Sequence, residues 1–457
     1  MKKNKLWLLV ATFAAAFLFL AACGDSDDNG ADDYDNGDDT TADEVEDNED
    51  AGELEGTITV SWWGNEGRHD ATNEVIDLFV SENPGVTINP HYGAWDGWQT
   101  AFAGDLEAGQ EADLMQVNFN WLQLYSPFGT TFADLEDPAI AAHLDLSNWD
   151  SQYIDVTRQS GVVQGVPVGM TARVPFMRAD IYEAAGLDVQ DINTWDDLIA
   201  AGNAIQEHHG DSVFALSPLG PQSMAYMVFS WLEQYTGRSF VDADGQLNYS
   251  LEELTDGFQL IQDFIDNGVM PDGAFDSDPI NAENPMWIEG AYGGVSEWDS
   301  SINAWINNLG EGGEDLVEIR PHFTMDGAQL SGWMSRPSMV FSISNNSDYP
   351  EVAAAFLNFM LTDERAIEIM GTDRGVPLNT VGRAYFDALG LGGHVVAANA
   401  IHAEAETTTM NAIFEFPEVR EVYESQLMEI FNGTSTVEAA AEFVYNNIQA
   451  VIDSLLD

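Results

Sequence analysis

The sequence predicts an α/β fold built as two lobes. Thr57 to Trp63 alternates β-branched and aromatic residues, which is typical of a strand. The next segment, Asp70 to Asn83, repeats apolar residues with helical spacing and stops at Pro84, and Val86 to Tyr92 again has the pattern of a strand. About 400 residues follow the N-terminal segments, which is too many for a single hydrophobic core. Strands and helices alternating over that length indicate two α/β lobes.

The stretch TITVSWWGNEGR, Thr57 to Arg68, joins the first strand to the first helix. The strand breaks at Gly64 and runs into a polar loop that contains Asn65. In an open α/β sheet, the carboxyl ends of strands and the N-termini of helices form the crevice where ligands bind. Because successive strand side chains point to opposite faces, one of the two adjacent tryptophans should face the core and Trp63 the crevice. The alternative that both belong to the core stays open.

The N-terminus has the pattern of a secretory signal. Lys2, Lys3 and Lys5 precede an apolar run from Leu6 to Leu20, and small residues lead into Cys23. Cleavage before a cysteine is the bacterial lipoprotein pattern, which predicts a signal peptide over residues 1–22 and a lipid on Cys23 that holds the protein on the outer face of the cytoplasmic membrane. An uncleaved anchor is the alternative. Cys23 is the single cysteine in 457 residues, so one chain has neither an internal disulfide nor a cysteine-based metal site.

Charge is distributed very unevenly along the chain. Between Asp25 and Glu55, 16 of 31 residues are acidic, which predicts a solvated, self-repelling tether over residues 23–56. All three lysines lie before Cys23, so the chain from that residue onward has 11 Arg against 78 acidic residues, a formal charge of −67. Such a charge makes nucleic acid a poor partner and predicts a surface adapted to high salt.

Two further strand ends carry aromatic and amide side chains. Trp95 lies in the loop that follows the second strand, whereas Trp98, three residues on, is expected in the core. A short apolar strand from Asp113 to Val117 ends in Asn118, Phe119, Asn120 and Trp121. Two amides beside an aromatic ring suit the recognition of hydroxyl groups combined with ring stacking.

Taken in order, these motifs resemble a known family. The order is WWGNEGRH, GAWDGW, ADLMQVNFNWL, GVPVGMTARVPFMRADIYEAAGL, TWDDLIAAGNAI and, late in the chain, GTDRGVPLN. It is similar to the carbohydrate-binding lipoproteins of ABC importers, the maltose-binding-protein-like extracellular solute-binding family. Its opening motif and RGVP loop look most like members that serve pectin-derived oligosaccharides, such as oligogalacturonide and rhamnogalacturonan binders.

The resemblance implies a periplasmic-binding-protein-like α/β fold in which two lobes close on sugar in a hinged interlobe cleft. It places the passages between lobes near residues 169–171, 319–321 and 371–377. Lobe one would then hold 57–170 and 322–370, and lobe two 171–321 and 371–457. Thr194, with Asp197 three residues on, is expected to form a capping box at the start of a helix in lobe two.

The resemblance also implies the residues that contact sugar. Stacking is expected from Trp63, Trp95, Trp121 and Trp298, and hydrogen bonds to hydroxyls from Asn65, Asn118, Asn120, Thr171 and Glu297. Tyr226 and Trp333 are further candidates, with core packing as the alternative for each. Arg68, Arg336 and Arg374 lie in motifs that should border the cleft, where a guanidinium holds a uronate carboxylate. Alternatively, Arg336 pairs with an acid of the chain, Arg374 braces the hinge and Arg68 caps its own loop.

Neither the motifs nor the resemblance points to an enzyme. No G-x-S-x-G, H-E-x-x-H, phosphate-binding loop or C-x-x-C pattern is present in the sequence. Paired carboxylates carry little information in a chain with 78 acids. We therefore expect no cofactor and no metal, an oligosaccharide ligand, an ABC permease as partner, and a monomer. A membrane-anchored hydrolase and a surface glycan adhesin are the alternative functions.

Overall fold

The computed structural model describes residues 53–242, 244–275 and 280–456. The predicted signal peptide, the lipidation site Cys23 and nearly all of the acidic tether lie outside the described residues. The first strand, β1, begins at Glu55, so the last residues expected in the tether belong to the sheet. In the part of the chain that is described, no helix combines the length and apolar character that a membrane span requires.

One mixed sheet runs through the described body, with strand order β2-β1-β3-β9-β6-β7. β1 is parallel to β2 and β3, whereas β9 is antiparallel to both β3 and β6. Two short strands complete it, β8 beside β6 and β10 beside β9. The strands are β1 (Glu55–Trp63), β2 (Gly85–Gly93), β3 (Leu114–Val117), β6 (Val166–Arg178), β7 (Gly294–Trp298), β8 (Val317–Ile319), β9 (Met334–Ile343) and β10 (Thr408–Thr409), and a separate hairpin joins β4 (Arg158–Gln159) to β5 (Val162–Val163).

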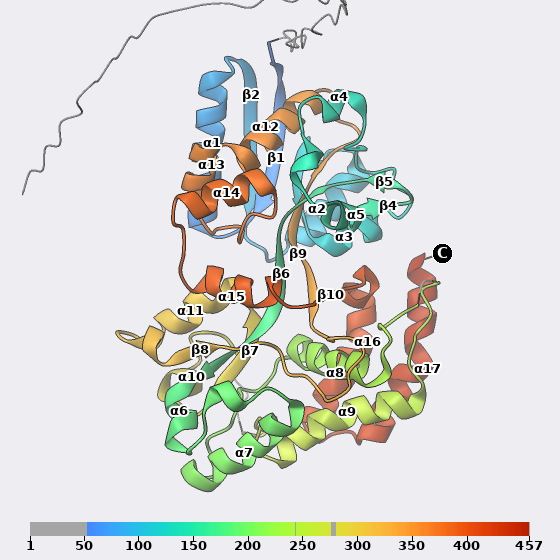
Figure 1. The fold of residues 1–457 in the computed structure, drawn as a ribbon. Helices are drawn as coiled ribbons and strands as arrows, with labels where there is room; N and C mark the ends of the chain where they lie inside the picture. Colours follow the sequence, from blue (N-terminus) through green and yellow to red (C-terminus); the bar gives the residue numbers. More distant parts are fainter. Residues whose placement is uncertain (1–52, 243, 276–279, 457) are drawn as a thin grey trace, which may run out of the picture. The chain divides into compact units, whose positions relative to one another are not determined.

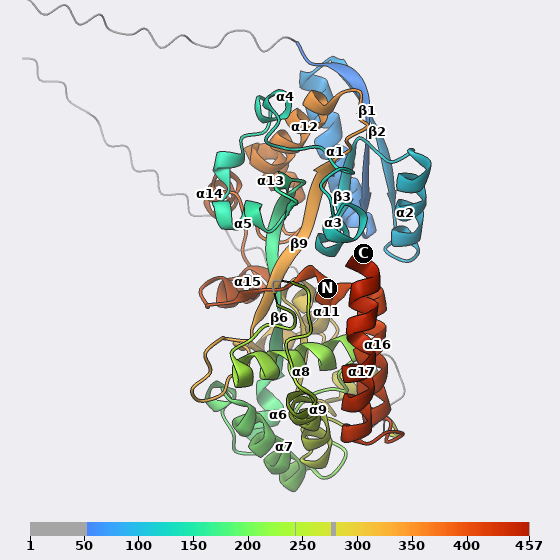
Figure 2. The ribbon, with the colours of Figure 1, turned by 90° about the vertical axis from the view of Figure 1, so that its right-hand side faces the viewer.

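Two long strands, β6 and β9, pass from one lobe to the other (Figures 1 and 2). β6 pairs with β9 as far as Ala172 and from Arg173 onward pairs with β7 instead. The β6–β9 register shifts on both sides of Gly169. A Cβ at this glycine would lie 2.8 Å from the carbonyl oxygen of Val376, so the position accepts no side chain without movement of the backbone.

Lobe one covers β1, β2, β3 and the adjoining halves of β6 and β9 with helices. Its core contains Val60, Trp62, Phe79 and Phe356, all less than a tenth exposed. Asn65 caps the first helix by accepting a hydrogen bond from the backbone N–H of Arg68. The helices are α1 (Glu66–Glu82), α2 (Trp98–Ala108), α3 (Phe119–Tyr125), α4 (Pro138–Ala141), α5 (Ser151–Asp155), α12 (Pro350–Thr362), α13 (Glu364–Met370) and α14 (Thr380–Ala388).

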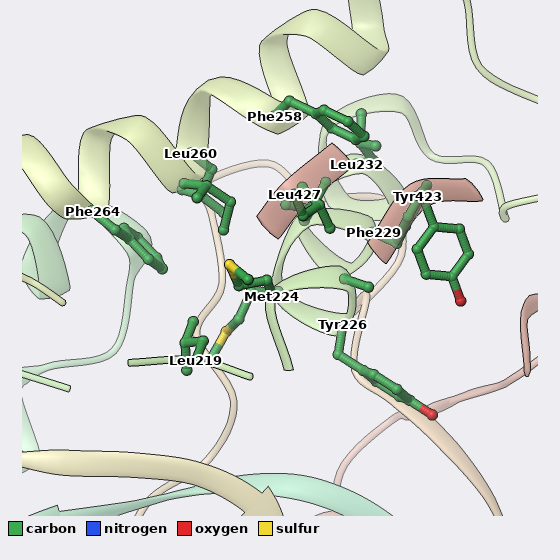
Figure 3. Packing of buried hydrophobic residues seen from close by; sticks show 14 of the residues in the cluster. Leu219, Met224, Tyr226, Phe229, Leu232, Phe258, Leu260, Phe264, Tyr423 and Leu427 are labelled. Atoms are coloured by element: carbon green, nitrogen blue, oxygen red, sulfur yellow. The ribbon is translucent and has the colours of Figure 1, made fainter. Parts of the chain in front are cut away.

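Lobe two is mostly helical and packs around α8, whose buried side chains meet those of α9 and α16 (Figure 3). The predicted capping box of Thr194 and Asp197 is present at the start of α7. The helices are α6 (Ala179–Ala184), α7 (Trp195–His209), α8 (Pro221–Thr236), α9 (Leu251–Asp266), α10 (Pro285–Glu289), α11 (Ile302–Asn307), α15 (His394–Ala403), α16 (Pro417–Phe431) and α17 (Val437–Leu456).

The short 3-10 helices of the two lobes are η1 (Leu146–Asn148), η2 (Val189–Asp191), η3 (Asp299–Ser301), η4 (Gly313–Asp315) and η5 (Ala412–Glu415).

Side-chain packing leads us to propose lobe limits that differ at two points from those expected from the motifs. Phe323 and Trp333 are buried among side chains of lobe two, although the expected limit near residue 321 placed them in lobe one. Phe386 of α14 and Val376 pack with Ile367 of lobe one, although both follow residue 371 and were expected in lobe two. We assign each large apolar side chain to the lobe whose core buries it, because burial of its apolar surface stabilises that lobe. We propose that the second passage is β9 and that the third lies between α14 and α15.

One buried acid in lobe two, Glu233, has no ion-pair partner among the residues that the structure describes. Glu233 of α8 is 3% exposed, and within the described residues its Oε2 has no hydrogen-bond partner. Burial raises the pKa of Glu233 from its ordinary value of 4.5 to about 7, because removal from water disfavours the charged carboxylate. The folded protein therefore holds this proton more tightly than the unfolded chain does.

This difference predicts a pH-dependent loss of stability that Glu233→Gln removes. The stabilising contribution is complete below about pH 4.5 and is lost as the pH rises through 7. The free energy of unfolding of the wild type, relative to that of Glu233→Gln, should fall by roughly 3 kcal/mol across this window. Urea unfolding at several pH values measures it. The exposed Glu442→Gln is the control, and parallel pH profiles for wild type and Glu233→Gln would contradict the prediction.

Candidate functional site

A cavity of about 380 Å³ lies between the lobes and is lined by side chains from both. From lobe one it receives the end of β1, the loop after β2 and the start of α3. From lobe two it receives the first turn of α8, the end of β7, η5 and α16, and β9 lies between. The lining residues are Trp63, Trp95, Asn118, Asn120, Gln222, Trp298, Arg336, Ser338, Glu415 and Arg420.

A smaller recess of about 140 Å³ adjoins this cavity and shares Trp298, Arg336 and Ser338 with it. Arg68, Thr171 and Arg374 also line the recess. Six residues expected at the site therefore line the main cavity, and three more line only the recess. The other five expected residues line neither cavity, and their contacts within the protein are described below.

The wall that lobe one contributes is aromatic. Trp63 is half-buried, and its ring centroid lies 5.2 Å from that of Trp95 and 5.4 Å from that of Trp121. Trp95 is 47% exposed and stacks on Trp121 at 5.8 Å with an interplanar angle of 11°. Trp121 itself is 1% exposed, and Trp62 is fully buried. Trp121, expected to stack on sugar, instead supports the two rings that line the cavity.

The wall that lobe two contributes centres on Trp298 at the end of β7. The guanidinium carbon of Arg336 lies 4.5 Å from the centre of its ring, and that of Arg173 lies 4.9 Å from it. Such cation–π contacts fix the orientation of both charged groups. Tyr226 meets Trp298 edge-on at 5.4 Å, but it is buried and donates its hydroxyl proton to Glu415 Oε1 at 2.9 Å. Tyr226 therefore positions Glu415 and does not itself line the cavity.

Arg336 connects the two walls. Its Nη1 donates to Asn118 Oδ1 at 3.3 Å, and its Nε lies 3.2 Å from Glu415 Oε2, which is an ion pair without hydrogen-bond alignment. Across the same gap, Asn120 Nδ2 donates to the backbone oxygen of Glu415 at 3.0 Å. Within the described residues Asn120 Oδ1 is buried without a partner, so this amide retains an acceptor.

Several expected ligand contacts are occupied by the protein itself. Asn65 is exposed, caps α1 and lines neither cavity. Glu297 accepts a hydrogen bond from Arg173 Nη1 at 3.1 Å. Trp333 is 5% exposed and donates its indole N–H to the backbone oxygen of Arg173 at 2.8 Å. Thr171 donates to Asp299, which His402 Nε2 also contacts at 2.8 Å.

Arg68 and Arg374 join the loop that ends β1 to the RGVP loop. Arg68 donates from Nε to the backbone oxygen of Asp373 at 3.1 Å and from Nη1 to that of Trp63 at 3.2 Å. Arg374 is 3% exposed and donates to Gln116 Oε1 at 3.1 Å and Thr72 Oγ1 at 2.9 Å. Burial, reinforced by the nearby charge of Arg68, lowers the pKa of Arg374. Their hydrogen bonds hold both guanidinium groups against lobe one.

Four lining residues were absent from the sequence prediction, namely Gln222, Ser338, Glu415 and Arg420. Gln222 and Ser338 lie close to predicted motifs, but Glu415 and Arg420 come from η5 and α16, far along the chain. The sole signal for Arg420 was that the sequence contains so few arginines.

The lining favours binding over chemistry. Ring faces, amides, a hydroxyl and guanidinium groups suit a ligand that has both apolar faces and hydroxyl or anionic groups. Among residues 53–242, 244–275 and 280–456, no cluster of three His, Asp or Glu side chains has the arrangement of a metal site.

Comparisons with known proteins agree with this lining. The chain is similar to an oligogalacturonide-binding protein of Yersinia enterocolitica, solved with saturated digalacturonic acid, with 27% identity, a TM-score of 0.79 and coverage of 88% of this chain and 100% of that one. A periplasmic solute-binding protein of Pectobacterium atrosepticum gives 28% identity, a TM-score of 0.80 and the same coverage. An arabinooligosaccharide-binding protein of Halalkalibacterium halodurans is 23% identical over 219 residues, which is 48% of this chain and 47% of that protein.

The predicted fold is confirmed, because these structural matches are periplasmic binding proteins. The chain spans about half the length of the curated relatives it matches. The sequence model of the family of bacterial extracellular solute-binding proteins matches residues 64–367 of this chain. Members of this family bind solutes and are non-catalytic, as the motifs predicted. The chain thus belongs to the bacterial extracellular solute-binding protein family.

Proposed function

We propose that this protein captures an oligosaccharide outside the cell and delivers it to an ABC permease. The observation that carries the proposal is the cavity between the lobes, where Trp63 and Trp95 face a lining that includes Trp298 of the other lobe. Indole faces stack on the apolar faces of pyranose rings, and amides and hydroxyls between them bind sugar hydroxyls. Closure of the lobes on the ligand would then create the form that docks on the permease.

We further propose that the ligand contains uronate groups, as pectin fragments do. Arg336 and Arg420 line the cavity in a chain whose formal net charge is −64. The Yersinia relative, which is solved with saturated digalacturonic acid, supports an acidic ligand. A neutral oligosaccharide is the second candidate, because the Halalkalibacterium relative binds arabinooligosaccharides.

A calorimetric panel of digalacturonate, a neutral galactose disaccharide and an arabinooligosaccharide tests the proposal. The wild type should bind at least one saccharide, and Trp95→Ala should weaken that binding about tenfold by removing an exposed stacking face, worth about 1.4 kcal/mol. The control is Tyr235→Ala, which removes another exposed aromatic ring that does not line the cavity. Absence of saccharide binding, or equal losses in both variants, would refute the cavity as the capture site.

We propose that Cys23 carries the lipid that keeps the protein at the membrane. The charged start, the apolar run and the small residues before this single cysteine support it. Cells fed a labelled fatty acid should label the wild type, and Cys23→Ala should appear unlabelled, as precursor or released protein. The lobes should melt at the same temperature in both forms. Label retained by Cys23→Ala would rule out this anchor.

A further inference from the structure

We infer that Arg420 is the specificity-determining residue of the cleft and that its guanidinium binds a uronate carboxylate of the ligand. This inference rests on the proposed function, because it names the group that binds the charged part of a captured saccharide. It differs from the expectation drawn from the motifs, which gave this role to Arg68, Arg336 and Arg374. The geometry of the five arginines around the cleft separates Arg420 from the rest.

Arg420 is anchored at one end and unengaged at the other. Its Nε donates to Glu424 Oε1 at 2.7 Å, one helical turn along α16. Its two terminal nitrogens, Nη1 and Nη2, have no hydrogen-bond partner among the described residues. The side chain is one-third exposed and lines the main cavity. Anchoring through Nε fixes the plane of the guanidinium and presents the nitrogen pair that binds a carboxylate bidentately.

Three of the other four guanidinium groups, those of Arg68, Arg173 and Arg374, have protein partners on both terminal nitrogens. Arg68 and Arg374 direct all three of their nitrogens to groups of lobe one. Arg173 uses both terminal nitrogens on Ser223, Gln222 and Glu297. Arg336 has no partner on Nη2 in the described part of the chain, whereas its Nη1 donates to Asn118 and its Nε is held beside Glu415, so Nη2 is its one terminal nitrogen without a partner.

The acids near Arg420 leave its two terminal nitrogens without a hydrogen-bond partner among the described residues. Glu424 contacts its Nε alone. Glu415 also lines the cavity, but one of its oxygens accepts from Tyr226 and the other lies beside Arg336. Both carboxylates therefore have partners of their own, and we expect an incoming carboxylate to bind the terminal nitrogens of Arg420 in the cavity that Arg336 also lines. The chain as a whole has a formal net charge of −64, so an anionic ligand needs local cations such as the arginines that line the cavity.

Calorimetry with digalacturonate and its dimethyl ester tests the inference, because the ester removes the charge and preserves the sugar rings. Arg420→Gln should weaken digalacturonate binding 10- to 100-fold and ester binding less than threefold. Arg420→Lys should restore part of the loss, since an ammonium keeps the charge without the planar pair of donors. The control is Arg383→Gln, which removes an arginine with the same arrangement, Nε to an acid four residues on, from a helix that does not line the main cavity. It should leave both affinities unchanged.

Equal losses for acid and ester in Arg420→Gln, with an unchanged melting temperature, would overturn the inference, because Arg420 would then only shape the cavity. A wild type that binds neutral saccharides but not digalacturonate would also overturn it and would leave saccharide capture standing. A wild type that binds no saccharide would refute the proposed function itself.

Discussion

The antiparallel pairing of β6 with β9 is the constraint on which the rest of the structure depends. Both strands belong to the two lobes, so their register fixes which side chains meet between them. Thr171 and Arg336 are direct partners in this register, and the switch of β6 to β7 at Arg173 places Trp298 opposite that residue. Trp298 and Arg336 thus reach the cleft from paired strands, where backbone geometry holds them in place.

The distribution of arginines is a second feature of the cleft. Five of the 11 arginines, namely Arg68, Arg173, Arg336, Arg374 and Arg420, surround the cleft in a chain with a net charge of −64. All five donate hydrogen bonds to the protein, and three of them, Arg68, Arg173 and Arg374, have partners on both terminal nitrogens. The cleft therefore combines fixed cations with exposed ring faces, and most of the remaining charge is negative and lies elsewhere. This separation is one of the observations behind the proposal of an acidic saccharide.

Local pattern was sufficient to predict much of the fold. The alternation in Thr57–Trp63 predicted a strand with one tryptophan in each environment, and Trp62 is buried whereas Trp63 lines the cleft. The Thr194 capping box was also visible from spacing alone. The order of short motifs added the family, which the match over residues 64–367 confirms.

The sequence pattern could not predict how deeply a side chain is buried or which residues distant in sequence lie close together. Trp121 and Trp333 lie in motifs beside the cleft, yet packing against neighbouring rings and strands buries both. Glu415 and Arg420 reach the cavity from η5 and α16, and no spacing in the sequence relates them to the first strand. Positions of this kind depend on tertiary packing, which single-sequence periodicity does not encode.

Hydrogen exchange with and without a bound saccharide tests most directly the claim that ligand is held between the lobes at this cavity. Saturating ligand should slow amide exchange both in the segment around Trp95 of lobe one and in residues 412–420 of lobe two. These segments are far apart in sequence, and both contribute residues to the lining of the cavity. Protection in both would support the account, whereas protection confined to one lobe, or located away from the cavity, would contradict it.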